Sequence, residues 1–175
     1  MQNNSLNHIV NYIAIAGFAS KCAKHNIPLI TDVCRQAVEG GYGISAGNLS
    51  GTFLYAFRET KKRHGHTMAI VESGIAHIHH QHCDILQIVS SNHQKHQMLA
   101  QKCVGAIVIG GGHGTKRLID QFLIQQKPVV ALTASGGIVE HELDKRVTMA
   151  DSSVNILDRL LGIPEGIEIR IAASR

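Results

Sequence analysis

GAIVIGGGHGTKRLIDQF, the segment from Gly105 to Phe122, decides the fold, because it joins an apolar run to a helical pattern through three consecutive glycines. A short apolar run that stops at glycine is typical of a buried strand, whereas the apolar spacing of residues 116–126 is helical. Glycine allows the chain to turn sharply between the two. The segment therefore predicts a strand, a glycine turn and a helix, the repeating unit of a parallel α/β fold.

The same alternation of strand and helix recurs along the 175 residues. We expect strands at residues 10–16, 42–46, 67–71, 84–89, 104–109 and 128–132, with a last edge strand at 167–171. We expect helices at residues 30–38, from the turn at 47–51 to about residue 63, and at 92–102, 116–126 and 152–161. Residues 140–150 show only weak periodicity. The pattern predicts a single doubly wound α/β domain over residues 1–175, Rossmann-like, with a mostly parallel sheet and helices on both faces.

The composition is that of a globular domain. Hydrophobic residues make up 44% of the chain and charged residues 17%, which favours a packed core over disorder. The formal net charge is +4, but Lys and Arg are scattered, and only residues 61–63 form a tight cluster. A solvated helix end explains this cluster at least as well as nucleic acid does, and a chain without Trp offers few platforms for stacking on bases. We therefore expect a small phosphorylated ligand and no nucleic acid partner.

Neither a membrane span nor an oxidising compartment is expected. The apolar run HIVNYIAIAG at residues 8–17 is too short to cross a bilayer and lacks the basic region of a signal peptide. The four cysteines, Cys22, Cys34, Cys83 and Cys103, show no CxxC spacing. The sequence thus favours a cytoplasmic protein without a membrane role.

Three glycine-bearing loops follow strands of the predicted sheet, namely AGNLSG at 46–51, GGGHGT at 110–115 and ASGG at 134–137. Backbone N–H groups at such glycines can approach an anion closely, and the N-terminus of the following helix adds favourable partial charge. Neither the P-loop pattern GxxxxGK[ST] nor a GxGxxG after the first strand is present. The loops and the end of the first strand predict these ligand-binding or phosphate-binding residues: Gly17, Gly47, Asn48, Ser50, Gly51, Gly110, Gly111, Gly112, His113, Gly114, Thr115, Ser135 and Gly136. Glu72 and Ser73 are expected near the ligand from their position alone.

The order of these motifs resembles a known superfamily. AGNLSG after the second strand, NHQKHQM at 92–98 in a helix, VGAIVI before GGGHGT, and KPVVAL at 127–132 are together similar to the SLOG proteins. That group includes the cytokinin-activating phosphoribohydrolases, often mislabelled lysine decarboxylases, as well as nucleotide-binding sensors and molybdenum cofactor carriers. The resemblance covers roughly residues 10–160. It implies a homodimer and a nucleotide or molybdopterin-like ligand.

Two charged positions depart from the pattern of the resembling enzymes, which carry PGGxGTxxE after a helix with an Arg-Lys pair. With the glycines aligned, Gly110 takes the place of the proline and Leu118 that of the glutamate. Lys95 and His96 take the places of the arginine and its neighbour. Leucine can neither stabilise positive charge on a ribose nor orient a water, whereas Lys95 can still bind phosphate as a point charge. The resemblance therefore implies ligand binding, by a sensor or a carrier, rather than hydrolysis.

Two alternatives stay open. A phosphoribohydrolase, which would cleave the N-glycosidic bond of a nucleoside 5′-monophosphate, would need a rearranged acid such as Glu140 or Glu142, with Lys95 as a further catalytic candidate. A metal-binding module could use HIHHQHC, because imidazoles and a thiolate suit Zn²⁺ or Cu²⁺. Its candidate ligands are His77, His79, His80, His82 and Cys83. These all fall within seven residues, whereas metal sites usually draw ligands from separated segments, so a polar loop is favoured over a metal site.

Overall fold

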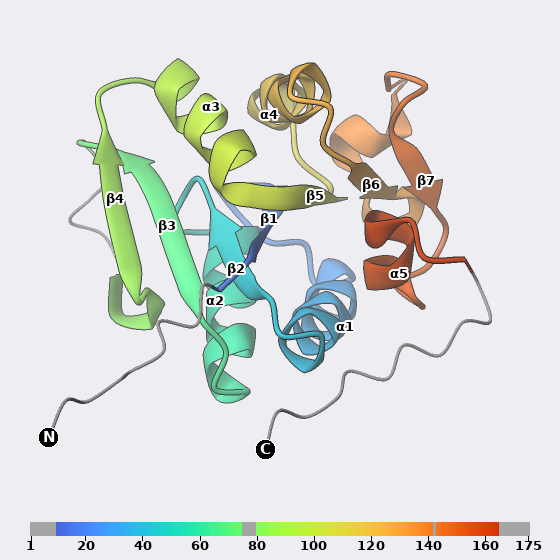
Figure 1. Ribbon diagram of the computed structural model, residues 1–175, viewed down its shortest axis with the longest axis horizontal. Coiled ribbons are helices and arrows are strands. Elements are labelled where there is room, and N and C mark those ends of the chain that lie inside the picture. Colours follow the sequence, from blue (N-terminus) through green and yellow to red (C-terminus); the bar gives the residue numbers. More distant parts are fainter. Residues whose placement is uncertain (1–9, 75–79, 142, 165–175) are drawn as a thin grey trace, which may run out of the picture.

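A single parallel sheet forms the centre of the protein (Figure 1). The structure, a computed structural model, describes residues 10–74, 80–141 and 143–164. Within these residues seven strands are hydrogen-bonded in the order β4-β3-β2-β1-β5-β6-β7, and every pair is parallel. The strands are β1 (Tyr12–Gly17), β2 (Gly43–Ala46), β3 (Thr67–Glu72), β4 (Ile85–Val89), β5 (Cys103–Ile109), β6 (Val129–Leu132) and β7 (Thr148–Ala150). The predicted Rossmann-like α/β fold is confirmed.

Helices cover both faces of this sheet (Figure 1). The α-helices are α1 (Asn26–Glu39), α2 (Thr52–Lys62), α3 (Asn92–Lys102), α4 (His113–Ile124) and α5 (Ile156–Leu161). Short 3₁₀ turns are η1 (His80–His82), η2 (Thr133–Ser135) and η3 (Gly137–Glu140). Helices α1, α2 and α5 pack on one face, and α3 and α4 on the other. No helix in the described part of the chain is long and apolar enough to cross a membrane.

The side chains of β1 show how the two faces differ. Ile13 and Ile15 are buried against α1, α2 and α5, whereas Ala14 and Ala16 are buried on the face of α3 and α4. This alternation follows from the two-residue period of a strand. Because Ala16 is small and lies near the carboxyl end of β1, it leaves room above the sheet at that end.

The structure corrects the predicted element bounds in a few places. The helix expected at 30–38 begins at Asn26, since Pro28 falls in the first turn, where proline is tolerated. The helix expected at 116–126 begins at His113, directly after the glycines. Strand β7 was not predicted, because its three residues include the exposed Thr148 and Met149 and show no apolar alternation. The strand expected at 167–171 lies outside the described residues.

The strand order reverses at β1, which lies between β2 and β5. From β1 the chain continues to α1 on one face, and from β5 it continues to α4 on the other face. Gly17 and Ile109, the last residues of β1 and β5, are partners in the ladder, so the two strands end side by side. The diverging connections leave a crevice at this point, the usual ligand position in open parallel sheets.

Candidate functional site

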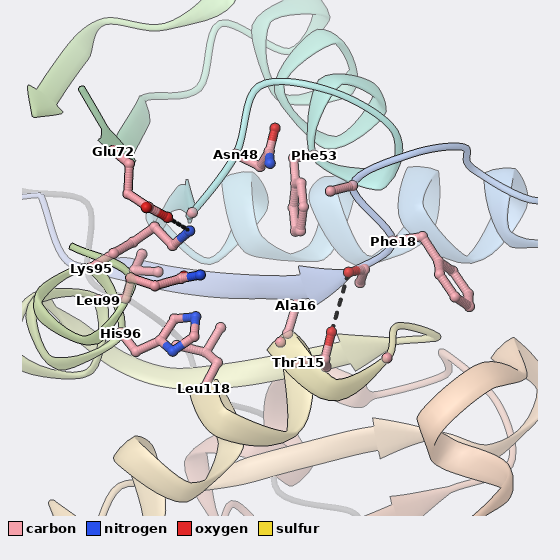
Figure 2. Close-up of a pocket in the computed structure, with 16 residues that line it drawn as sticks. Ala16, Phe18, Asn48, Phe53, Glu72, Lys95, His96, Leu99, Thr115 and Leu118 are labelled. Carbon is pink, nitrogen blue, oxygen red and sulfur yellow. Dashed lines mark hydrogen bonds and ion pairs between the residues drawn. The ribbon is translucent and has the colours of Figure 1, made fainter. Parts of the chain in front are cut away.

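A pocket of about 350 Å³ lies at this crevice, beyond the carboxyl ends of β1, β2 and β3 (Figure 2). The N-terminal parts of α3 and α4 form its other walls. Its lining residues are Ala16, Gly17, Phe18, Ala19, Gly47, Asn48, Phe53, Glu72, Asn92, Lys95, His96, Leu99, Gly112, Gly114, Thr115 and Leu118. The volume is near the lower end of the range for small-molecule sites, roughly 300–1,000 Å³.

Two glycines before α4 adopt a backbone conformation with positive φ, which is unfavourable for other residues. Gly110 and Gly111 have φ angles of 72° and 100°. A Cβ on Gly111 would also overlap the Oγ1 atom of Thr115. Thr115 in turn donates a hydrogen bond from Oγ1 to the carbonyl oxygen of Gly17, at 3.2 Å. The turn therefore brings the start of α4 against the end of β1.

The first turn of α4 presents backbone donors to the pocket. Lys116 N donates to the carbonyl oxygen of Gly112, at 3.1 Å. For the N–H groups of His113, Gly114 and Thr115 there is no acceptor within the described residues. Gly112 and Gly114 line the pocket, and a Cβ at either would meet open space. Free amides at a helix N-terminus, between glycines that carry no side chains, form an anion-binding arrangement.

The loop at 46–51 has a different role, because its polar groups hold the β1 loop. Thr52 N donates to the carbonyl oxygen of Phe18 at 2.9 Å, and Ser50 Oγ donates to that of Ala19 at 2.5 Å. Asn48 Oδ1 accepts from Leu49 N within the same loop, at 2.7 Å. The first amide of α2 is thus already hydrogen-bonded, so this helix has fewer free N–H groups for an anion than α4 has.

The loop at 134–137 supports the glycine run from outside the pocket. Ser135 Oγ accepts from Gly110 N at 2.7 Å and donates to the carbonyl oxygen of Leu132 at 2.5 Å. Ile138 N donates to the carbonyl oxygen of Gly111, at 2.8 Å. Ser135 therefore fixes the conformation of the turn without reaching the pocket.

Lys95 and Glu72 form an ion pair at the end of the pocket away from Phe18 (Figure 2). The distance from Nζ to Oε1 is 3.0 Å, and the side chains are 9% and 33% exposed respectively. A Cβ on Gly47 would lie 3.3 Å from Cδ of Lys95 and 3.0 Å from Leu99. The absence of a side chain at Gly47 is what lets the Lys95 stem pass through this wall.

His96 and Leu118 lie beside each other on the wall formed by α3 and α4 (Figure 2). Burial, together with the charges of Lys95 and Arg117, lowers the pKa of His96 to about 4, so its imidazole is neutral at neutral pH. Leu118 lines the pocket at the position where the resembling enzymes carry their glutamate, and it also packs in the core under α3 and α4. The wall is thus uncharged at this point.

Glu72 is the sole carboxylate among the described residues that line the pocket. Asp120 is exposed and faces a separate groove between α3 and α4, together with His93 and Arg117. Glu140 is exposed and does not line the pocket, and Glu142 lies outside the described residues. The pocket therefore contains an acid, but on β3 rather than on α4.

The predicted ligand-binding residues divide into two groups. Those that line the pocket are Gly17, Gly47, Asn48, Lys95, Gly112, Gly114 and Thr115. Those that the structure places next to it, but not in its lining, are Ser50, Gly51, Gly110, Gly111, His113, Ser135 and Gly136. Sequence reasoning missed Phe18 and Asn92, although each follows the end of a strand closely and the same loop rule could have found them. Ser73 is exposed outside the lining.

The histidine-rich segment is only partly described. His77 and His79 lie outside the described residues, and His80 is placed only as part of η1. The carbonyl oxygen of His82 accepts from Thr67 Oγ1 at 2.7 Å, and Cys83 Sγ donates to the carbonyl oxygen of Ile85 at 2.8 Å. Among the described residues, no three His, Cys, Asp or Glu side chains come together as a metal site.

A parallel sheet with a pocket at the reversal of its strand order defines a Rossmann-like α/β protein. Within that class, the model of the SLOG cluster4 family matches residues 10–157. The chain belongs to this family, which confirms the resemblance read from GGGHGT and its neighbouring motifs. No curated protein matches the sequence.

Solved structures with the same fold have distant sequences. The molybdenum cofactor binding protein from Rippkaea orientalis is 19% identical, with a TM-score of 0.74 over 88% of this chain and 97% of that one. The molybdenum cofactor carrier protein from Chlamydomonas reinhardtii is 18% identical, with a TM-score of 0.74 over 87% and 99%. DNA processing protein A from Streptococcus pneumoniae is 14% identical, with a TM-score of 0.68 over 86% and 62%. At these identities the likeness concerns the fold.

Proposed function

We propose that the protein binds a small phosphate-bearing nucleotide or nucleotide-like cofactor, as a sensor or a carrier, with the phosphate at the N-terminus of α4. The observation that carries this proposal is the set of free amides at His113, Gly114 and Thr115, which adjoin a pocket at the switch point of the sheet. Such amides, aided by the helix dipole, stabilise an anion without any basic side chain.

Binding without hydrolysis is favoured by the wall of the pocket. Hydrolysis of a glycosidic bond needs a carboxylate near the reacting carbon, and the α4 position that would supply it is Leu118. The carboxylate that does line the pocket, Glu72, is already paired with Lys95. Membership of the SLOG cluster4 family and the shared fold of two proteins named for the molybdenum cofactor also support a nucleotide-like or molybdopterin-like ligand. We expect no release of free base from nucleoside monophosphates.

A thermal-shift panel of nucleotides and pterin cofactors tests the proposal, because a ligand raises the melting temperature according to its affinity for the native state. The discriminating variant is Gly112→Asp. Gly112 is the N-cap of α4 with an extended backbone, and an Asp side chain at an N-cap accepts from the amides of the first turn. The fold is retained, but the introduced carboxylate takes the place of the phosphate.

We expect Gly112→Asp to keep or raise the melting temperature of the free protein and to abolish the shift caused by phosphate compounds. Gly112→Ala is the matched control, since its methyl group meets open space and supplies no acceptor. Unchanged binding in Gly112→Asp would place the anion elsewhere. A panel in which no phosphate compound shifts the wild type would reject the proposed function itself.

We also propose a homodimer in a reducing, cytoplasmic compartment. Among the described strands, edge strand β4 has a sheet neighbour on one side only, and its Ile85 and Ile88 are 47% and 55% exposed. Exposed apolar residues on an edge strand favour association. Cys22, Cys34, Cys83 and Cys103 are free thiols, which agrees with a reducing compartment. Light scattering of the purified protein measures the assembly directly.

A further inference from the structure

The charged side chains of the pocket cancel one another. Among the described residues that line it, Lys95 is the sole Lys or Arg and Glu72 the sole carboxylate, and they are paired at 3.0 Å. His96 adds no charge at neutral pH, because burial and its cationic neighbours lower its pKa to about 4. The attraction for an anion therefore comes from the amides and dipole of α4, which amount to about half a unit charge.

The side chain of Lys95 is fixed in position by the residues that pack around it. Its side chain is 9% exposed, and its stem passes Gly47 so closely that a Cβ there would lie 3.3 Å from Cδ and 3.5 Å from Cε. Glu72, at the last position of β3, is more open and uses Oε1 for this pair. Within the described residues, Oε2 has no hydrogen-bond partner. The carboxylate thus stays beside a fixed ammonium group and also faces the pocket.

We propose, on the basis of the binding function above, that Glu72 is an internal counter-ion that restricts the pocket to ligands with a single phosphate group. One phosphate group can accept hydrogen bonds from the free amides of α4. A second or third phosphate would bring negative charge that Lys95, already neutralised by Glu72, does not balance. The ligand class is therefore a phosphate monoester rather than a nucleoside di- or triphosphate.

Replacing a counter-ion changes the affinity for the ligand in the opposite direction from replacing a residue that binds the ligand. If Glu72 accepted hydrogen bonds from the ligand, its removal would weaken binding. If it acts as a counter-ion, its removal exposes the charge of Lys95 and strengthens the binding of anions. Glu72→Gln separates the two, because the amide oxygen can still accept from Lys95 Nζ while the negative charge is gone.

The experiment is titration calorimetry at low ionic strength and without divalent cations, on wild type and Glu72→Gln. The probes are adenosine mono-, di- and triphosphate and, because they carry no base, inorganic phosphate and pyrophosphate. We expect wild type to prefer each monophosphate probe over its polyphosphate counterpart. In Glu72→Gln the polyphosphates should bind about tenfold tighter, as expected for one uncovered charge near the ligand, and the monophosphates should gain less.

Asp120→Asn is the matched control, since it removes the same charge from an exposed position of α4 outside the pocket lining. It should leave all affinities unchanged. The double variant Glu72→Gln/Lys95→Gln should lose the gain, because the uncovered charge is then absent. This second variant keeps the test valid if Glu72→Gln alters stability, since it isolates the part of the effect that depends on Lys95.

The outcomes are distinct. Weaker or unchanged polyphosphate binding in Glu72→Gln overturns the counter-ion role while leaving phosphate binding intact. An equal gain in Asp120→Asn also overturns it, because the effect is then one of overall charge. If wild type binds none of the phosphate probes or the nucleotide panel, the proposed function fails and this inference fails with it.

Discussion

At the scale of single residues, the pocket owes its chemistry to positions where a side chain is missing or neutral. Gly112 and Gly114 leave the α4 amides open, Leu118 removes the expected carboxylate, and His96 is uncharged. The sequence predicted the glycines and Leu118 from one contiguous motif. It could not predict that Glu72 pairs with Lys95, since that contact depends on how α3 crosses the end of β3.

Gly111→Ala should be destabilising. The native φ of 100° is unfavourable for alanine, and the new Cβ would overlap Thr115. We expect a loss of about 1–3 kcal/mol in the free energy of unfolding, measured by urea denaturation. Gly114→Ala is the control, because its Cβ meets open space in the first turn of α4. Equal stability of the two variants would contradict the described turn.

The neutral state of His96 makes stability depend on pH. The folded-state pKa is lowered from 6.5 to about 4, so between these values the unfolded chain binds the proton more readily than the folded one. The contribution of the neutral His96 to the free energy of unfolding is therefore fully present above pH 6.5 and is lost as the pH is lowered toward 4. The full effect is at most about 3 kcal/mol.

This dependence can be measured by urea unfolding at pH 7 and pH 4.5. In His96→Gln the loss of stability between the two should be smaller than in wild type, because the titrating group is removed. His93→Gln, a change at an exposed histidine of the same helix, should behave like wild type. A pH dependence in His96→Gln as steep as in wild type would show that other groups cause it.

At the scale of the elements, three similar glycine loops perform three different tasks. The loop before α4 exposes amides, the loop before α2 binds the backbone of Phe18 and Ala19, and the loop after β6 supports Gly110. The sequence predicted the same task for all three, because glycine spacing reports backbone freedom and not which amides are already hydrogen-bonded. How the loops pack on one another decides which of them has free amides for an anion and which of them holds a neighbouring loop in place.

Ser135→Ala tests the supporting role of the loop after β6. It would remove the acceptor of the buried Gly110 N–H and the donor to Leu132 O. We expect a loss of about 1–3 kcal/mol in unfolding free energy and weaker phosphate binding, although Ser135 lies outside the pocket lining. Thr133→Ala, which loses only the 3.3 Å bond to Ala150 O from an exposed residue, is the control. Full phosphate affinity in Ser135→Ala would show that the turn holds its shape unaided.

At the scale of the whole molecule, the position of the site follows from the strand order. The alternation of strands and helices predicted a doubly wound sheet, but not that β1 would lie between β2 and β5. Strand order depends on which face each helix covers, and this is set by packing between residues far apart in sequence, such as Gly17 with Ile109 and Thr115. One pocket therefore collects groups from β1, β3, α3 and α4.

This convergence predicts the pattern of hydrogen exchange when ligand binds. The phosphate compound with the largest thermal shift should slow exchange in three separate segments, residues 16–19, 92–96 and 112–115, because it contacts all the walls of the pocket at once. Residues 146–161, which contain β7 and α5 and lie away from the lining, should exchange as before and serve as an internal control. Protection confined to the segment around 112–115 would mean that the ligand sits on the α4 N-terminus outside the crevice. Protection around β7 and α5 instead would place the site at a different part of the sheet edge and contradict the switch-point assignment.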